Sequence, residues 1–466
     1  MKFSLKGARP PLVYTLPRLN RGVLGTLRCI APLYLRGGLG IRIQTVHGAE
    51  RLIEEYRRFE QGESLLILAF RHIHPDDAQA MFTLLNNRLP AIARRRGVRL
   101  RRRPHAHFLY GRGVPLWKGR WLTWLFSRVG GIPVARNALV RNNIDLVRQI
   151  IVEGQYPLAL APEAQVTYHN GIVRSLEPGF AQFAVWGLRD TLKRGNAKQI
   201  RILPVALHYR YGRKPEEAFR KVITAIEQRS GLRVPKARWD LGFTEVLGFV
   251  GGAVLDICEG YYRRVYGLMP LRAADNSGET EAEYLTETPG DFTRQRVEAL
   301  TNAVLGLLER RLPVPGRRGT FLGRILAVRQ AGWDWIFRRG VDRPLGESPL
   351  QSALEDYTAA ETQLLLRHLE VTDVLSYMVP EYALESGDAN RAVETALNLH
   401  DLLGRLQGGT IGERMRIRPT FLEFHIGAAA ALDGSELQEE KGERQLREQV
   451  IGRIWTEFAR LSGDGA

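Results

Sequence analysis

Short apolar runs alternate with amphipathic stretches between residues 61 and 215. The runs have the length and the flanking turn residues of β-strands, and most of the stretches between them repeat apolar residues at helical spacing. The predicted strands are 64–70, 105–111, 130–136, 156–163 and 200–209, and the clearest predicted helices are 142–154 and 178–195. Strands that alternate with helices favour an α/β fold, with a central mixed sheet flanked by helices.

Outside this block the pattern is mainly helical. We expect an N-terminal helical arm over residues 1–60, the α/β core over 61–215, a helical extension with an acidic linker over 216–312, and a mainly helical C-terminal domain over 313–466. The acidic, turn-rich stretch ETEAEYLTETPGD indicates the linker. A Ser-Pro pair that begins at Ser348 marks the start of a helix in the C-terminal part.

The composition narrows the class of protein. Hydrophobic residues make up 44% and charged residues 25% of the 466 residues, as in globular proteins. The two cysteines, Cys29 and Cys258, provide neither a disulfide framework nor a CxxC metal signature. The N-terminal residues lack an apolar core of signal-peptide length, and we find no run of about 20 apolar residues, which a spanning helix requires. We therefore expect a cytoplasmic protein.

Positive charge is concentrated before residue 346. The net charge is +17, but residues 346–466 carry 11 Lys and Arg against 21 Asp and Glu, a net of −10, which leaves +27 on residues 1–345. Seven arginines fall within residues 94–103, RRRGVRLRRR. Such a run attracts a polyanion, and the candidates are anionic lipid, an acidic carrier protein and nucleic acid. A solvated basic loop without a partner is the simpler alternative.

The residues that carry chemistry follow the apolar run 64–70. His72, His74, Asp76 and Asp77 fall within six positions of each other. Asp77, in the first turn of the next helix, can reach back to His72, fix its tautomer and leave its other nitrogen to accept a proton from a substrate hydroxyl. A metal site of the HxHxD type is a second interpretation, and it needs three or more convergent ligands. A polar helix cap with structural histidines is the third.

Four motifs, in order, resemble those of the glycerolipid acyltransferase family, which includes the 1-acylglycerol-3-phosphate acyltransferases. The first is histidine, four residues and then aspartate, from His72 to Asp77. The second is GGIPVAR at 130–136, the third is APEAQVTYHNG followed by SLEPGFAQFA, and the fourth is the strand ILPVALH. The resemblance covers residues 60–215, which is less than half of the chain.

The resemblance implies roles for particular residues. His72 would be the general base that deprotonates the acceptor hydroxyl, and Asp77 would orient it. The positions that it implies for substrate binding are Gly131, Arg136, Glu163 and Pro204. Among them, Arg136 would contact a phosphate or head group, Glu163 would shape the acceptor site and Pro204 would line the acyl pocket.

The implied reaction moves a fatty acyl group from acyl-CoA or acyl carrier protein to a lipid hydroxyl, without a cofactor or a metal. The acceptor would be a lysophospholipid, glycerol-phosphate or another lipid alcohol. Family members often have Gly-Thr-Arg after the glutamate, whereas this chain has Ala164, Gln165 and Val166, which leaves the acceptor open. We expect a peripheral membrane protein that contacts the membrane surface through residues 94–103.

Two functions of other classes stay open. One is a metal-dependent hydrolase that uses His72, His74 and Asp76. The other is a non-catalytic basic protein that binds nucleic acid or membrane through residues 94–103. Because no RNA or DNA motif accompanies that charge, we expect no nucleic-acid partner.

Overall fold

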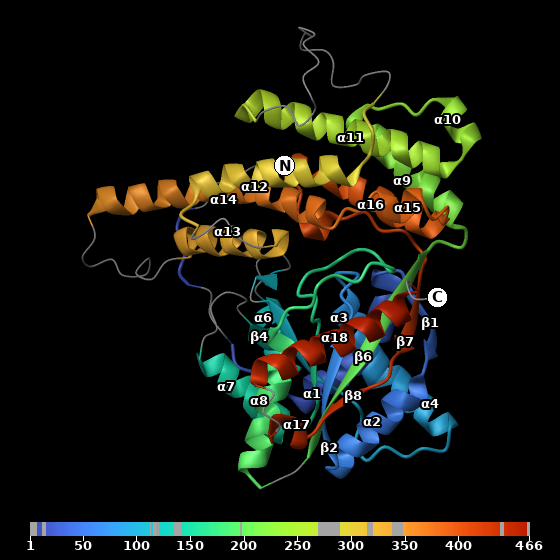
Figure 1. The fold of residues 1–466 in the computed structure, drawn as a ribbon, viewed down its shortest axis with the longest axis vertical. Helices are drawn as coiled ribbons and strands as arrows, with labels where there is room; N and C mark the ends of the chain where they lie inside the picture. Colours follow the sequence, from blue (N-terminus) through green and yellow to red (C-terminus); the bar gives the residue numbers. More distant parts are fainter. Residues whose placement is uncertain are drawn as a thin grey trace. The chain divides into compact units, whose positions relative to one another are not determined.

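A computed structural model of the chain is shown in Figure 1. It describes residues 7–11, 15–111, 113–114, 119, 121–134, 141–195, 198–268, 289–314, 320–337, 348–438 and 442–463. The chain divides into two compact units, each built from separate segments. The α/β unit comprises Tyr14–Arg213 and Ile417–Ala466, and the helical unit comprises Met1–Val13 and Lys214–Arg416.

The α/β unit is built on a mixed sheet of eight strands. They are β1 (Ile41–His47), β2 (Ser64–Phe70), β3 (His107–Gly111), β4 (Ile132–Val134), β5 (Leu158–Leu160), β6 (Gln199–Tyr211), β7 (Thr420–Ile426) and β8 (Ala430–Leu432). The order is β1-β7-β6-β2-β5-β3-β4, and β8 also pairs with β6. The strands β6, β2, β5, β3 and β4 run parallel, whereas β7 and β8 are antiparallel to β6. The predicted α/β fold with a mixed sheet is confirmed.

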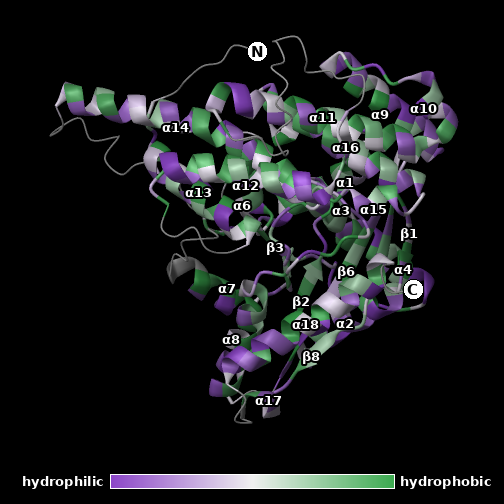
Figure 2. Ribbon diagram, turned by 45° about the horizontal axis from the view of Figure 1, so that its top comes forward, coloured by the Kyte–Doolittle hydropathy of each residue, from purple (hydrophilic) through white to green (hydrophobic). Residues whose placement is uncertain are grey.

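Helices cover this sheet. They are α1 (Arg21–Leu33), α2 (Ala49–Gln61), α3 (Asp77–Thr83), α4 (Leu89–Arg95), α6 (Trp121–Arg128), α7 (Arg141–Glu153), α8 (Gly179–Lys193), α17 (Ser435–Gln438) and α18 (Glu443–Ser462), with short π-helical segments at Tyr34–Gly38 and Leu84–Arg88. The ribbons of α8 and α18 alternate between hydrophobic and hydrophilic residues (Figure 2), as expected of helices with one buried face. The apolar side chains of α8 and α18 pack in one core cluster with side chains of β2, β5 and β6.

The strand β2 lies in the middle of this core. All seven of its residues are buried, because a parallel strand in an α/β fold is covered on both faces. Leu65, Ile67 and Ala69 belong to one core cluster with side chains of α7, α8 and α18. The residues that follow Phe70 therefore start from a fixed strand end.

The helical unit contains α9 (Pro215–Ser230), α10 (Lys236–Leu241), α11 (Phe243–Tyr266), α12 (Arg294–Arg311), α13 (Phe321–Ile336), α14 (Pro349–Ser376), α15 (Glu381–Leu384) and α16 (Ala389–Leu406), with a short 3-10 helix at Ile411–Glu413. The Ser-Pro start signal is confirmed, because the Ser348 side chain accepts a hydrogen bond from the Gln351 N–H at the start of α14. Among the helices that the structure describes, none is both long and apolar enough to cross a membrane.

The predicted domain boundaries need correction at both ends of the chain. Residues 41–47, within the predicted helical arm 1–60, form β1, and residues 417–466, within the predicted helical C-terminal domain, return to the sheet as β7, β8 and α18. The strand β7 alternates buried and partly exposed residues, which is the two-residue period of a strand. It lies in otherwise helical sequence, and only pairing with β1 and β6 defines its place.

Candidate active site

The imidazole of His72 lies directly after β2 and is held by Asp77. Asp77 is the first residue of α3, and its Oδ2 lies 3.0 Å from His72 Nδ1. The Asp77 side chain is fully buried, whereas 25% of the His72 side chain is exposed. An ionised carboxylate can only accept hydrogen bonds, so Nδ1 carries the proton and the lone pair stays on Nε2. Among the described residues, no hydrogen bond is made to this Nε2.

Two further donors fix the Asp77 carboxylate. Its Oδ2 also accepts the backbone N–H of His74 at 2.8 Å, and its Oδ1 accepts the Tyr209 hydroxyl at 2.5 Å. Complete burial, together with the neighbouring Asp77 charge, raises the pKa of Tyr209 well above its ordinary value. The phenol therefore stays protonated and donates. Three donors from β6, the loop and the imidazole thus hold one carboxylate in one orientation.

A buried ion pair supports His72 from behind. Glu163, whose side chain is completely buried, accepts the backbone N–H of His72 at 3.0 Å through Oε2 and Arg71 Nη2 at 3.1 Å through Oε1. Arg71 is also completely buried, and its Nη1 donates to Asn170 O and to Ser462 Oγ, each at 2.6 Å. Ser462 is the last residue of α18. The backbone of the proposed base is therefore tied to a helix almost four hundred residues away in the sequence.

The loop after β5 runs alongside the loop after β2. The Thr167 N–H donates to His72 O at 2.8 Å, and the Tyr168 N–H donates to Ile73 O at 3.1 Å. Ala164 and Tyr168 have φ values of 55° and 57°, in the left-handed region that residues other than glycine rarely adopt. Such strained positions are held by surrounding contacts and concentrate at functional sites.

The structure brings three of the six predicted site residues together, namely His72, Asp77 and Glu163. Gly131 precedes β4, at the far end of the strand order, where a Cβ would lie 3.0 Å from Phe126 O. Pro204 is buried within β6, opposite Ala69. Arg136 lies outside the described residues.

Both oxygens of Glu163 are engaged by Arg71 and His72, which makes it a positioning residue for the site. The expected contact with the acceptor stays a prediction.

The neighbouring His74 and Asp76 make a separate pair. His74 Nδ1 lies 3.4 Å from Asp76 Oδ2, while His72 Nδ1 lies beside Asp77. Each imidazole thus faces its own carboxylate. In the part of the chain that the structure describes, the donor atoms of His72, His74 and Asp76 do not converge as a group that could hold one ion. The hydrolase interpretation has no support from this geometry.

Two residues that sequence reasoning missed complete the site, Arg71 and Tyr209. An arginine directly after a buried strand is a signal of a buried carboxylate partner, but it does not identify Glu163. No signal marked Tyr209, because it meets Asp77 across 132 residues of sequence. In β6 it stands between His208 and Arg210, and neither neighbour indicates a contact with Asp77.

The arginine run lies at the opposite edge of the sheet from His72. It precedes β3, whereas His72 follows β2, and both strands run in the same direction. The backbone N–H groups of Arg101 and Arg102 donate to Glu60, near the end of α2, at 2.9 and 3.0 Å. The seven residues of β2 separate the two edges by roughly 20 Å. A partner bound at the arginines is therefore not beside the reacting groups.

Comparison with known proteins identifies no family for this chain. No protein-family model matches the sequence, and none of the curated proteins matches it. The resemblance to the glycerolipid acyltransferases therefore stays a prediction from four motifs.

Proposed function

We propose that the α/β unit transfers an acyl group from a thioester to a lipid hydroxyl, with His72 as the general base. The observation that carries this proposal is the 3.0 Å contact from His72 Nδ1 to the buried Asp77, which leaves the lone pair of Nε2 on a partly exposed ring. A base must be reachable by its substrate and fixed in its tautomer. His72 meets both conditions.

The reaction needs one proton-transfer group. His72 Nε2 takes the proton of the acceptor hydroxyl while the oxygen attacks the thioester carbonyl carbon. The tetrahedral intermediate collapses, the carbon–sulfur bond breaks, and the departing thiolate takes the proton back from the imidazolium. The Asp77 carboxylate stabilises the positive charge that His72 carries between these two steps. No covalent acyl-enzyme is required.

Exposed apolar side chains in the same unit support a lipid acceptor. Leu33 and Tyr34, at the end of α1, are 74% and 50% exposed, and Trp121 and Trp124 of α6 are 63% and 55% exposed. Aromatic residues with one wet and one apolar side are enriched where proteins meet a membrane interface. Side chains of this kind suit a protein that takes its acceptor from a bilayer.

The test is a transfer assay with defined substrates. Purified protein is incubated with radiolabelled acyl-CoA or acyl carrier protein and a panel of lysophospholipids, glycerol-phosphate and lipid alcohols, and products are identified by mass spectrometry. We expect one acylated product with the wild type and a loss of about 10²–10⁴-fold in His72→Gln.

Two control variants accompany His72→Gln. His74→Gln should lose much less activity, because the hydrogen bond to Asp77 comes from the His74 backbone N–H, which glutamine keeps. His368→Gln, in the helical unit, should match the wild type. Absence of any acylated product, or full turnover in folded His72→Gln, would contradict the proposal.

A further inference from the structure

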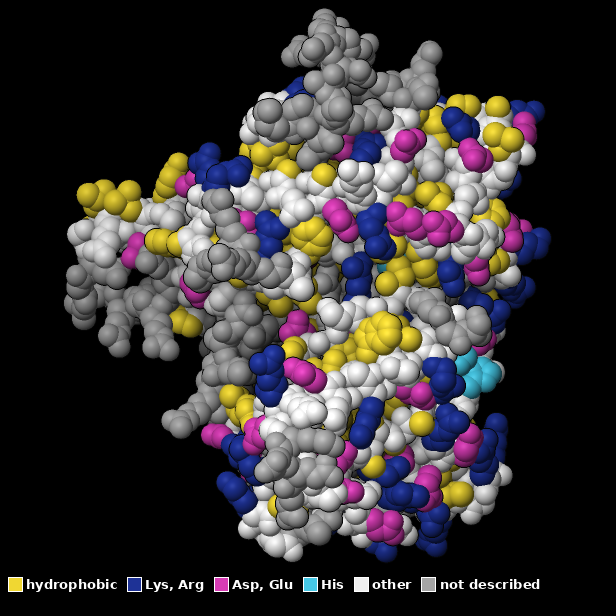
Figure 3. Space-filling view, in the orientation of Figure 1, with side chains coloured by type: hydrophobic (Ala, Val, Ile, Leu, Met, Phe, Trp, Pro, Cys, Tyr) yellow, Lys and Arg dark blue, Asp and Glu magenta, His cyan; other side chains and the backbone are white. Residues whose placement is uncertain are grey.

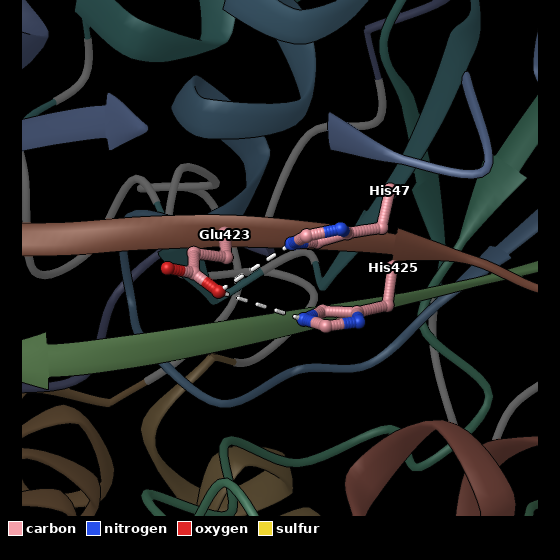
Figure 4. Close-up of side chains that lie close together, drawn as sticks. All are labelled: His47, Glu423 and His425. Carbon is pink, nitrogen blue, oxygen red and sulfur yellow. Dashed lines mark ion pairs between the residues drawn. The ribbon is translucent and has the colours of Figure 1, made fainter. Parts of the chain in front are cut away.

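A second group of histidine and carboxylate side chains lies on the sheet, two strands away from β2. His47 is the last residue of β1, and Glu423 and His425 belong to β7 (Figure 4). His47 and His425 are neighbours in the parallel pairing of β1 with β7. Glu423 and His425 are two residues apart on one strand, so their side chains leave the same face.

The donor atoms of these three side chains converge. Glu423 Oε2 lies 3.6 Å from His47 Nε2 and 3.9 Å from His425 Nε2. One ligand atom from each residue falls within 4.8 Å of both others. Among the described residues, this is the one group of three His, Cys, Asp or Glu side chains whose ligand atoms lie this close together. Figure 4 shows both imidazoles turned toward the same carboxylate oxygen.

The side chains of this group are partly exposed. The side chain of His47 is 53% exposed, and those of Glu423 and His425 are 26% and 27% exposed. Histidine side chains are visible in cyan at the edge of the surface in Figure 3. The side chains of His47 and Glu423 are therefore open to solvent, whereas the Nε2 atom of His425 is itself buried and makes no hydrogen bond among the described residues.

Packing holds the imidazoles in place. The rings of His47 and His425 stack at 4.6 Å between centroids, and His208 of β6 lies against the other side of His425 at 4.4 Å.

We propose that His47, Glu423 and His425 bind a divalent transition-metal cation of the zinc class. Two imidazoles and one carboxylate are a common ligand set for Zn²⁺, and water completes the coordination. Tetrahedral bonds of about 2.0–2.1 Å place neighbouring ligand atoms roughly 3.4 Å apart. The 3.6 Å between His47 and Glu423 is already near this value, and partly exposed side chains can close the remainder. Magnesium, which prefers oxygen ligands, should not bind.

Two existing contacts affect cation binding in different ways. The Thr45 hydroxyl lies 3.1 Å from His47 Nε2 and has to release this nitrogen. Arg210 Nη2 donates to the other carboxylate oxygen, Glu423 Oε1, at 3.1 Å. That contact holds the carboxylate in orientation and leaves Oε2 for the metal, as outer partners of metal ligands commonly do.

The cation would join two distant parts of the chain. His47 comes from β1 near the N-terminus, and the other two ligands come from β7. An ion that binds the folded protein and not the unfolded chain raises the unfolding temperature. A bound ion would therefore stabilise the pairing of β7 with β1. This effect does not depend on the proposed acyl transfer.

The test is titration of the untagged, full-length protein with Zn²⁺, and with Co²⁺ as a spectroscopic probe. We expect one ion per chain, visible d–d absorption of bound Co²⁺, a rise in unfolding temperature of a few degrees with Zn²⁺, and no response to Mg²⁺. His425→Gln and Glu423→Gln should each weaken Zn²⁺ binding at least tenfold. The matched control is His368→Gln, a histidine that contacts Tyr262 and Tyr266 in the helical unit and should bind Zn²⁺ like the wild type.

Two results would overturn the site. The first is a wild-type protein that shows neither stoichiometric Zn²⁺ binding nor Co²⁺ absorption. The second is equal affinity in the wild type and in folded His425→Gln and Glu423→Gln, which would assign the ion to other residues. Circular dichroism of the ion-free variants verifies that they are folded, so a loss of binding cannot be attributed to unfolding.

Discussion

Two groups of histidine and carboxylate side chains share one sheet but differ in how the carboxylate is used. Asp77 is completely buried and points one oxygen at His72 Nδ1, while Glu423 is partly exposed and points one oxygen at two imidazole Nε2 atoms. In the first group the carboxylate fixes one imidazole, which suits the proposed proton transfer. In the second, two imidazole nitrogens lie near one carboxylate oxygen, where we propose that an ion binds. We infer that burial and the arrangement of the side chains, rather than residue type, distinguish the chemistry proposed for each group.

The variant Asp77→Asn should distinguish the two groups most clearly, by its effects on the acyl-transfer rate and on Zn²⁺ affinity. An amide at this position can donate toward His72 Nδ1 and so favours the wrong tautomer. We expect the acyl-transfer rate to fall by about 10²–10⁴-fold, with Zn²⁺ affinity unchanged. Initial rates and a Zn²⁺ titration on the same preparation measure both.

The matched control for this variant is Asp76→Asn, which changes the neighbouring carboxylate. It should lose far less transfer activity than Asp77→Asn, because Asp76 faces His74 and not His72. The reverse order of the two losses would favour chemistry at His74 and Asp76, as the metal-hydrolase interpretation requires.

Next in size is the stability cost of removing the buried charge behind the site. Glu163→Gln leaves the completely buried guanidinium of Arg71 without its ion pair, which should destabilise the fold by about 3–5 kcal/mol. Glu423→Gln, measured in chelator, breaks ion pairs that are at least partly exposed and should cost about 1 kcal/mol or less. Urea unfolding curves measure both variants. Equal costs would show that the two carboxylates do not differ in burial as described.

His105, which belongs to neither group, tests how burial alone affects a histidine. His105 is completely buried, and this burial lowers its pKa to about 4, although its Nε2 contacts Val129 O at 2.9 Å. The unfolded chain, with an ordinary histidine pKa near 6.5, binds more protons between about pH 6.5 and pH 4. The stabilising contribution of neutral His105 is complete above this window and is lost as the pH falls through it.

For His105 this loss is on the order of 3 kcal/mol across the window. The free energy of unfolding of the wild type should therefore decrease from pH 6.5 to pH 4 more steeply than that of His105→Gln, which lacks the titrating group. Parallel curves for the two proteins would contradict the assignment, whatever the stability of the variant at neutral pH.

Local patterns predicted much of the α/β core and the centre of the candidate site. The strands β2 and β6 and the contact from His72 to Asp77 depend on neighbouring residues, since five positions separate the pair across one strand-to-helix turn. The strands β1 and β7, in contrast, are defined by pairing across almost the whole chain. The convergence of His47 with Glu423 and His425 follows from that pairing, which hydrophobic periodicity does not report.

The smallest expected effect belongs to Tyr209→Phe, which removes one of the three donors from Asp77 and keeps the ring. The lost hydrogen bond to a charged group should cost about 1.5–3 kcal/mol of stability. The carboxylate keeps its contacts with His72 Nδ1 and the His74 N–H, so the imidazole stays oriented. Transfer should fall only several-fold, as a decrease in kcat with little change in KM, because Tyr209 is buried and acts through Asp77. Tyr211→Phe, on the same strand, is the matched control. A loss as large as that of Asp77→Asn would mean that Tyr209 itself takes part in the proton transfer.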